Sequence, residues 1–127
     1  MATVDLGKDN FEKVITESPM VFVDFWAPWC GPCRGFAPIY DKAAQAHQDV
    51  VFGKVNTDEE QELAGAFDIR SIPTLMVFRE KVVLFQQAGA LPASALEQMI
   101  SQVKSLDMAK VHLEIAERDK QGEQNQV

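Results

Sequence analysis

A continuous apolar run at residues 20–26 is the strongest constraint on the fold of this chain. Only Asp24 interrupts it. A strand that is apolar on both faces is typical of the centre of a sheet that helices cover on either side, as in βαβ architectures. A second run of this kind lies at residues 50–55. The pattern therefore predicts an α/β fold, with these two strands in the middle of the sheet and a helix between them.

The other expected elements follow from the spacing of apolar residues and from turn signals. Thr57 and Glu60 have the spacing of a capping box, which predicts that a helix opens there. Lys81 falls in a tight turn of the kind that favours glycine, so we expect a strained turn or one of another type. Further helices are expected at residues 9–15, about 30–47 and about 92–106, and further strands at 4–6, 74–78 and 82–86.

Length and charge limit the possible functions. The 127 residues suffice for one domain with some excess, which we divide into a domain at 1–106 and an extension at 107–127. The net charge of −7 argues against nucleic-acid binding, because phosphate recognition requires a basic patch. The first seven residues lack the pattern of a signal peptide, and no run reaches the length of a membrane span. We therefore expect a cytoplasmic protein that does not enter a membrane.

The only two cysteines, Cys30 and Cys33, follow the central strand directly. If a helix opens at this point, their Cα atoms lie roughly 5 to 6 Å apart, within the range of a disulfide. A cysteine at the N-cap faces unpaired backbone N–H groups and the positive end of the helix dipole, which favour the thiolate. Cys30 is therefore the expected nucleophile, and Cys33 is the more shielded thiol that resolves a mixed disulfide. Gly31 permits the sharp bend, and Pro32 is tolerated in a first turn.

A Cys-x-x-Cys pair has other possible uses. A structural zinc site needs about four ligands, and the two histidines lack the required spacing. Covalent haem attachment requires a histidine where this chain has Arg34. A permanent structural disulfide remains an alternative, although such bridges belong to oxidising compartments and usually close longer loops. A reactive dithiol is the interpretation that the pattern favours, and it requires neither a metal nor another cofactor.

The sequence resembles the thioredoxin family. The resemblance covers roughly residues 4–106 and rests on the strand at 21–25, the segment 26–33 with its WCGPC core, the segment 69–74, and the single residues Pro38, Lys54 and Gly89. It implies the thioredoxin fold, a central mixed β-sheet flanked by helices on both faces. It also implies a monomeric protein-disulfide reductase that acts on disulfide-containing proteins. An NADPH-dependent flavoprotein, thioredoxin reductase, would return the electrons.

The resemblance assigns supporting roles to Asp24 and Lys54. A carboxylate in a doubly covered strand should have a raised pKa, and it could exchange protons with the sulfur of Cys33. The alternative is an aspartate that bonds nearby loop backbone. Lys54 would meet Asp24 if their strands are neighbours, and its ammonium would steady the carboxylate charge. An ordinary lysine at a strand end is the alternative.

The resemblance also implies a substrate groove beside the cysteines. Pro73 is cis in the family, and a cis bond there would leave the backbone of Ile72 free to pair with an extended substrate. The expected substrate-binding residues are Trp29, Gly31, Pro32, Ile72, Pro73 and Gly89.

The extension at 107–127 exceeds the usual length of the family. Asp107 could cap a separate short helix, and residues 121–127 are polar enough to be disordered. The apolar residues between Met108 and Ile115 could bind a partner. An alternative function is therefore a thioredoxin-like module that binds a partner or chaperone client, with the extension as its docking segment.

Overall fold

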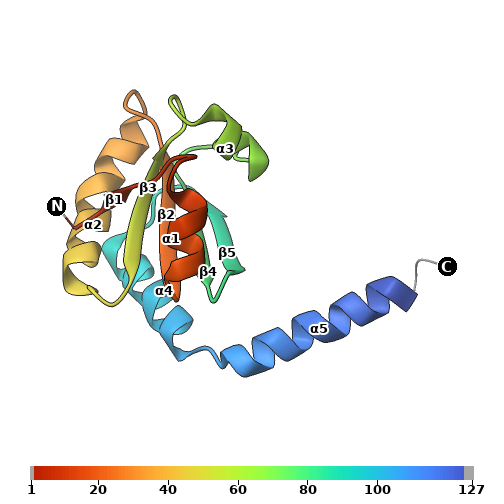
Figure 1. The fold of residues 1–127 in the computed structure, drawn as a ribbon. Coiled ribbons are helices and arrows are strands. Elements are labelled where there is room, and N and C mark those ends of the chain that lie inside the picture. The colour runs from red at the N-terminus through yellow and green to blue at the C-terminus, as the bar shows by residue number, and fades with distance from the viewer. Residues whose placement is uncertain (1, 125–127) are drawn as a thin grey trace.

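A five-stranded sheet forms the centre of the computed structural model, which describes residues 2–124 (Figure 1). The strands are β1 (Val4–Asp5), β2 (Met20–Trp26), β3 (Val51–Asn56), β4 (Thr74–Arg79) and β5 (Val82–Ala88). Their order is β1-β3-β2-β4-β5; the first three strands are parallel, and β4 runs antiparallel to both β2 and β5. The expected mixed sheet is confirmed, with the apolar strand β2 at its centre.

Helices cover both faces of this sheet (Figure 1). The helices that cover it are α1 (Phe11–Glu17), α2 (Gly31–Ala46), α3 (Gln61–Ala66) and α4 (Ala93–Ser105), and α5 (Met108–Gln124) follows them. Residues of α2 and α4 pack on one face, and residues of α1 and α3 pack on the other. Among the described residues, no helix combines the length and the apolar character needed to cross a bilayer.

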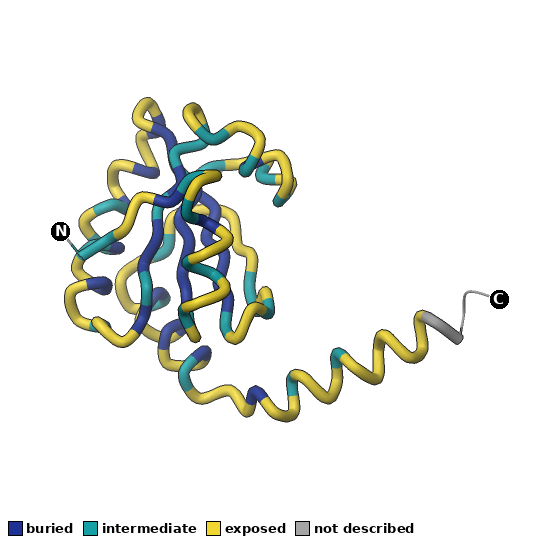
Figure 2. The backbone as a smooth tube through the Cα atoms, viewed as in Figure 1, coloured by how far each residue is buried: buried dark blue, intermediate teal, exposed yellow. Residues whose placement is uncertain are grey.

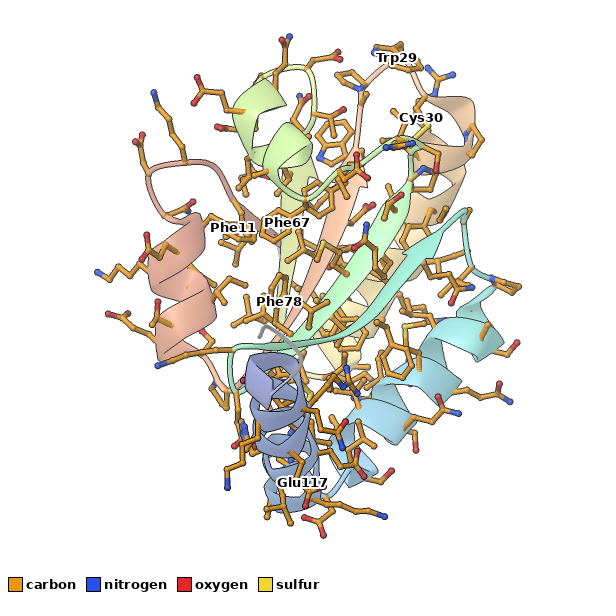
Figure 3. The ribbon with its side chains drawn as sticks, turned by 90° about the vertical axis from the view of Figure 1, so that its right-hand side faces the viewer. Phe11, Trp29, Cys30, Phe67, Phe78 and Glu117 are labelled. Atoms are coloured by element: carbon orange, nitrogen blue, oxygen red, sulfur yellow. A yellow bond between two sulfur atoms is a disulfide. The ribbon has the colours of Figure 1, made fainter. Side chains whose placement is uncertain are left out.

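The side chains of β2 divide between two cores. Phe22 joins the core under α2 and α4, whereas Val23 and Phe25 join the core under α1 and α3. In the second core Phe11 and Phe67 meet with ring centroids 5.3 Å apart, and each lies 6.0 Å from Phe78 (Figure 3). Burying one such side chain contributes about 1.5–3 kcal/mol. The alternation along β2 therefore fixes which face Asp24 occupies: the same face as Phe22, toward α2.

The start of α3 differs from the expectation. The helix begins at Gln61, and its N-cap, Glu60, makes no side-chain capping bond. Thr57, expected in a capping box, instead donates from its hydroxyl to the carbonyl oxygen of Trp26 at 3.0 Å. Its backbone N–H donates to the same oxygen at 2.8 Å. The capping-box prediction is wrong because the end of β2 uses both donors of this threonine.

The extension forms a longer helix than expected. Asp107 accepts a bond from the N–H of Lys110 at 3.3 Å, so the predicted cap is confirmed. The helix α5 then continues through Gln124, although composition predicted disorder from Gln121. Its residues are good helix formers, and Glu114 and Arg118 have favourable i,i+4 spacing. Residues 125–127, also expected to be disordered, lie outside the described part of the chain. Most of α5 is exposed and extends away from the domain (Figure 2).

Arg79 fixes the junction between α4 and α5. Its Nη1 donates to the carbonyl oxygens of Val103 at 2.6 Å and Leu106 at 3.0 Å. The last carbonyls of a helix lack partners within it, and a cation there is favoured by the helix dipole. A strand residue thus terminates α4. That residues 1–106 form a domain of their own remains a prediction.

The turn between β4 and β5 has two non-glycine residues in the left-handed region. Glu80 has φ of 51° and Lys81 has φ of 69°. Positive φ at both central positions is the geometry of the type I′ hairpin turn. A side chain in this region costs roughly 1–2 kcal/mol because its Cβ approaches the following carbonyl oxygen. The expected strain is therefore present, and the turn keeps the common hairpin geometry.

We predict that Lys81→Gly raises the free energy of unfolding by about 1 kcal/mol, because glycine relieves this strain. Urea denaturation measures the change. Lys81→Ala is the matched control: it removes the charge but keeps the Cβ, so its stability should stay close to wild type. Equal stabilisation by both variants would contradict an origin in the backbone.

Candidate active site

The two cysteines sit where β2 passes into α2, at the top of the domain in Figure 3. Cys30 is the N-cap of α2 and has extended backbone angles. Cys33 lies in the first turn, and the two sulfurs form a disulfide with a Cα–Cα distance of 5.2 Å. This distance lies within the range that a disulfide accepts. The predicted helix start and cysteine pair are therefore both present.

The backbone treats the two sulfurs differently. The N–H of Cys33 donates to the Sγ of Cys30 at 3.2 Å. The positive end of the α2 dipole acts on the same sulfur, so both effects favour a negative charge on Cys30. Cys33 was expected to be the more shielded thiol, but the exposed fractions of the two residues are nearly equal, at 4% for Cys30 and 2% for Cys33. The difference between the sulfurs therefore comes from the helix N-terminus more than from access to solvent.

Asp24 lies in the interior beneath the helix. It is 1% exposed, and neither carboxylate oxygen has a hydrogen-bond partner. The alternative that it bonds loop backbone is therefore wrong. Burial raises the pKa of Asp24 to about 7, and the positive charge of Lys54 limits that rise. The carboxyl group consequently changes its charge near neutral pH.

The register of the sheet makes Lys54 a neighbour of Asp24. The two residues are direct partners on the parallel strands β2 and β3, so they share a face. The Nζ of Lys54 lies 4.6 Å from the ring centroid of Trp26, a cation–π distance. The half-buried Lys54 therefore remains inside the structure instead of extending into water.

The predicted groove residues come together beside the disulfide. The Ile72–Pro73 peptide bond is cis, and the carbonyl oxygen of Ile72 lies 3.7 Å from the Sγ of Cys30. The N–H of Gly89 donates to the carbonyl oxygen of Pro73 at 2.8 Å, which holds the end of β5 against this loop. Gly31 and Pro32 are exposed at the start of α2. All of these residues therefore adjoin the sulfur of Cys30 or the loop beside it.

Asp58 is a contact that sequence reasoning missed. Trp29 is 67% exposed, yet its Nε1 donates to the Oδ1 of Asp58 at 3.1 Å. The sequence analysis gave Asp58 no role. The two residues are 29 positions apart, and nothing in their local pattern links them. This bond orients a large exposed indole beside the cysteine pair.

These groups are suited to one kind of chemistry. A sulfur whose negative charge the helix start stabilises can attack a disulfide, and a second thiol in the same turn can close the ring. Trp26 and Ile72 pack against the pair, and Asp24, on the sheet face toward α2, supplies a buried carboxyl group with a pKa near neutrality. The fold and the site together define a thiol–disulfide oxidoreductase.

Comparison with known proteins gives the family. The Thioredoxin family model matches residues 2–102. A relative in Streptomyces coelicolor, which bears the name thioredoxin 2, is 52% identical over 120 residues, 94% of this chain and 90% of the relative. Thioredoxin of Alicyclobacillus acidocaldarius is 43% identical over 103 residues, 80% of this chain and 98% of that protein. The chain belongs to the thioredoxin family.

Solved structures agree with the assignment. Plasmodium falciparum thioredoxin superposes with a TM-score of 0.74 at 34% identity, covering 79% of this chain and 98% of that one. A mutant thioredoxin of Halobacterium salinarum gives a TM-score of 0.76 at 30% identity, covering 82% of this chain and 92% of that one. The Streptomyces alignment spans 120 residues, whereas the family model ends at residue 102, so the alignment includes part of the extension.

We predict that Asp24→Asn stabilises the protein in a pH-dependent way. The carboxyl group has a pKa of about 7 when folded and about 3.9 when unfolded, so its stabilising contribution is complete below pH 4 and is lost as pH rises to 7. Above pH 7 the buried charge costs up to about 4 kcal/mol, which asparagine removes. Urea unfolding of both proteins at pH 4 and pH 8 measures the difference. A gain of equal size at both pH values would show that ionisation is not the cause.

Proposed function

We propose that this protein reduces disulfide bonds in other proteins. The thiolate of Cys30 attacks one substrate sulfur, forming a mixed disulfide and releasing the other substrate sulfur as a thiolate, which takes a proton. Cys33 then attacks the sulfur of Cys30, forming the Cys30–Cys33 disulfide and releasing the second substrate thiolate. The substrate gains two electrons and the protein loses two. The main support for Cys30 as the nucleophile is the hydrogen bond that the Cys33 N–H donates to its Sγ.

Asp24 is the group we propose to take the proton of Cys33 before the second step. Its support is threefold: it lies on the sheet face toward α2, its oxygens have no partner, and its pKa is about 7. A base with a pKa near the working pH is well matched to proton transfer. We propose that Lys54 moderates this pKa from the neighbouring strand.

The substrate would lie across the groove defined by Trp29, Ile72, Pro73 and Gly89, with Gly31 and Pro32 at its edge. An extended segment pairs well with exposed backbone groups and places a disulfide beside them. The carbonyl of Ile72, 3.7 Å from the Sγ of Cys30, lies where such a segment would approach. Asp58 would serve this groove indirectly by orienting Trp29.

The cycle needs a source of electrons. We propose an NADPH-dependent flavoprotein, thioredoxin reductase, which would reduce the Cys30–Cys33 disulfide. The cytoplasm is the proposed compartment, because a dithiol donor works only where it is returned to its reduced form. Catalysis would need one copy of the chain, since the nucleophile Cys30 and the resolving thiol Cys33 form their disulfide within it.

We predict that Cys30→Ser abolishes the reduction of insulin disulfides by dithiothreitol-recycled protein. Cys33→Ser should instead accumulate a covalent adduct between Cys30 and the substrate, detectable by mass spectrometry and released by excess thiol. Retained turnover in Cys30→Ser would overturn the assignment. A wild-type protein that fails to reduce insulin would instead favour the alternative, a partner-binding module in which redox chemistry is incidental.

We predict that Asp24→Asn slows the second step selectively. The wild-type rate of mixed-disulfide resolution should rise with pH through about 7, as Asp24 loses its proton and can accept another. The variant should lose this rise and be slower by on the order of a hundredfold, the usual scale of general base catalysis. Rapid-quench trapping of the adduct measures the step. Lys54→Met is the comparison variant. Because the charge of Lys54 lowers the pKa of Asp24, its loss should shift the midpoint of the pH–rate profile to higher pH, and the rate should still rise with pH.

A further inference from the structure

The strand β5 leaves one edge of the sheet open. It is the last strand of the order β1-β3-β2-β4-β5 and pairs only with β4. The backbone groups on its outer side have no backbone partner among the described residues. In Figure 1 this strand forms the right-hand edge of the sheet, and α5 extends from the bottom of the domain on the same side. An open edge is a template for another strand.

The composition of β5 does not protect this edge. Its sequence, VVLFQQA, has no charge and no proline over seven residues. Natural edge strands usually carry lysine, proline, a bulge or a short length to prevent pairing, and of these devices β5 has only an irregularity at Leu84, where its register with β4 shifts. The opposite edge follows that rule, because β1 has only two residues and one of them is Asp5. Val83 of β5 is 47% exposed, so apolar surface accompanies the free backbone groups.

We propose that β5 pairs antiparallel with β5 of a second copy of this chain, so that the two sheets become continuous around a twofold axis. A twofold contact uses the same patch on both copies and needs no second surface. Two copies of β5 can pair without placing like charges opposite each other, because the strand has no charged residue. This matters because the net charge of −7 makes two copies of the chain repel each other. The proposal does not depend on the redox function, because neither cysteine belongs to β5, although its Ala88 end adjoins Gly89 of the candidate site.

The helix α5 adds to this contact. His112 of α5 bonds Glu80 in the β4–β5 turn at 3.1 Å, so the helix starts beside the Val82 end of β5. In an antiparallel pair this end lies next to the Ala88 end of the partner strand. The helix therefore extends toward the second copy, and its Leu113 is 61% exposed.

The contact is small. A seven-residue strand is about 23 Å long, which alone covers much less than the roughly 800 Å² per partner of a standard interface. The dimer should therefore be weak and concentration-dependent. It would add to a protein that already works as one copy.

Sedimentation velocity on the full chain, with reductant present, tests the proposal between about 0.02 and 1 mM, concentrations suited to a weak complex. The expected result is a rise from 14.2 kDa toward twice that mass. Val83→Lys should weaken association by roughly tenfold, because it replaces an exposed apolar side chain of the edge with a charge that disfavours strand pairing. Insulin reduction at low concentration should be unchanged in this variant.

Val4→Lys is the matched control, since it makes the same change at a valine of similar exposure, 41%, on the other edge. It should leave the association unchanged. A chain that stays monomeric at 1 mM overturns the proposal. So does an association that Val4→Lys weakens and Val83→Lys does not. Amide hydrogen exchange gives a second readout: β5 should become protected at high concentration in the wild type and in Val4→Lys only.

Discussion

The beginning of α2 is the constraint on which the rest of the site depends. Cys30 caps this helix and Cys33 lies in its first turn, so one structural feature sets both their 5.2 Å Cα separation and the different environments of their sulfurs. Unpaired N–H groups at a helix N-terminus attract negative charge whatever the side chain that carries it. The sulfur of Cys30 receives this stabilisation although it is almost fully buried. Reactivity here is therefore a property of backbone geometry.

The sheet positions the buried carboxyl group of Asp24, and the burial of that group lowers the stability of the protein. Parallel pairing of β2 with β3 places Asp24 against Lys54, in an interior where the carboxyl group finds no hydrogen bond. An ionised carboxylate in such a place is expensive, and a single positive neighbour offsets only part of the cost. Burial of apolar side chains in the two surrounding cores offsets the destabilisation caused by this carboxylate. A structure optimised for stability alone would have an apolar residue at position 24.

The end of the domain away from the cysteines has a different organisation. Arg79 terminates α4, and His112 of α5 bonds the turn that joins β4 to β5. The extension therefore leaves the domain from a defined point, next to the start of the open edge strand. The edge strand begins at this point and ends at Ala88, directly before Gly89 of the candidate site. The strained turn at Glu80 and Lys81 lies between the extension and the edge.

The sequence alone determined the elements and the chemistry of the cysteine pair. Apolar runs, a helix start after a buried strand and the spacing of two thiols are local, so the central strands, the N-cap at Cys30 and the cap at Asp107 could all be predicted. The family resemblance added the expected groove residues and the roles that we propose for Asp24 and Lys54. Tertiary structure decided what depends on partners distant in the chain: Thr57 bonds the end of β2 instead of capping a helix, and Asp58 holds Trp29. A hydrogen bond between distant residues leaves no periodicity in the sequence, because its geometry exists only after the strands have assembled.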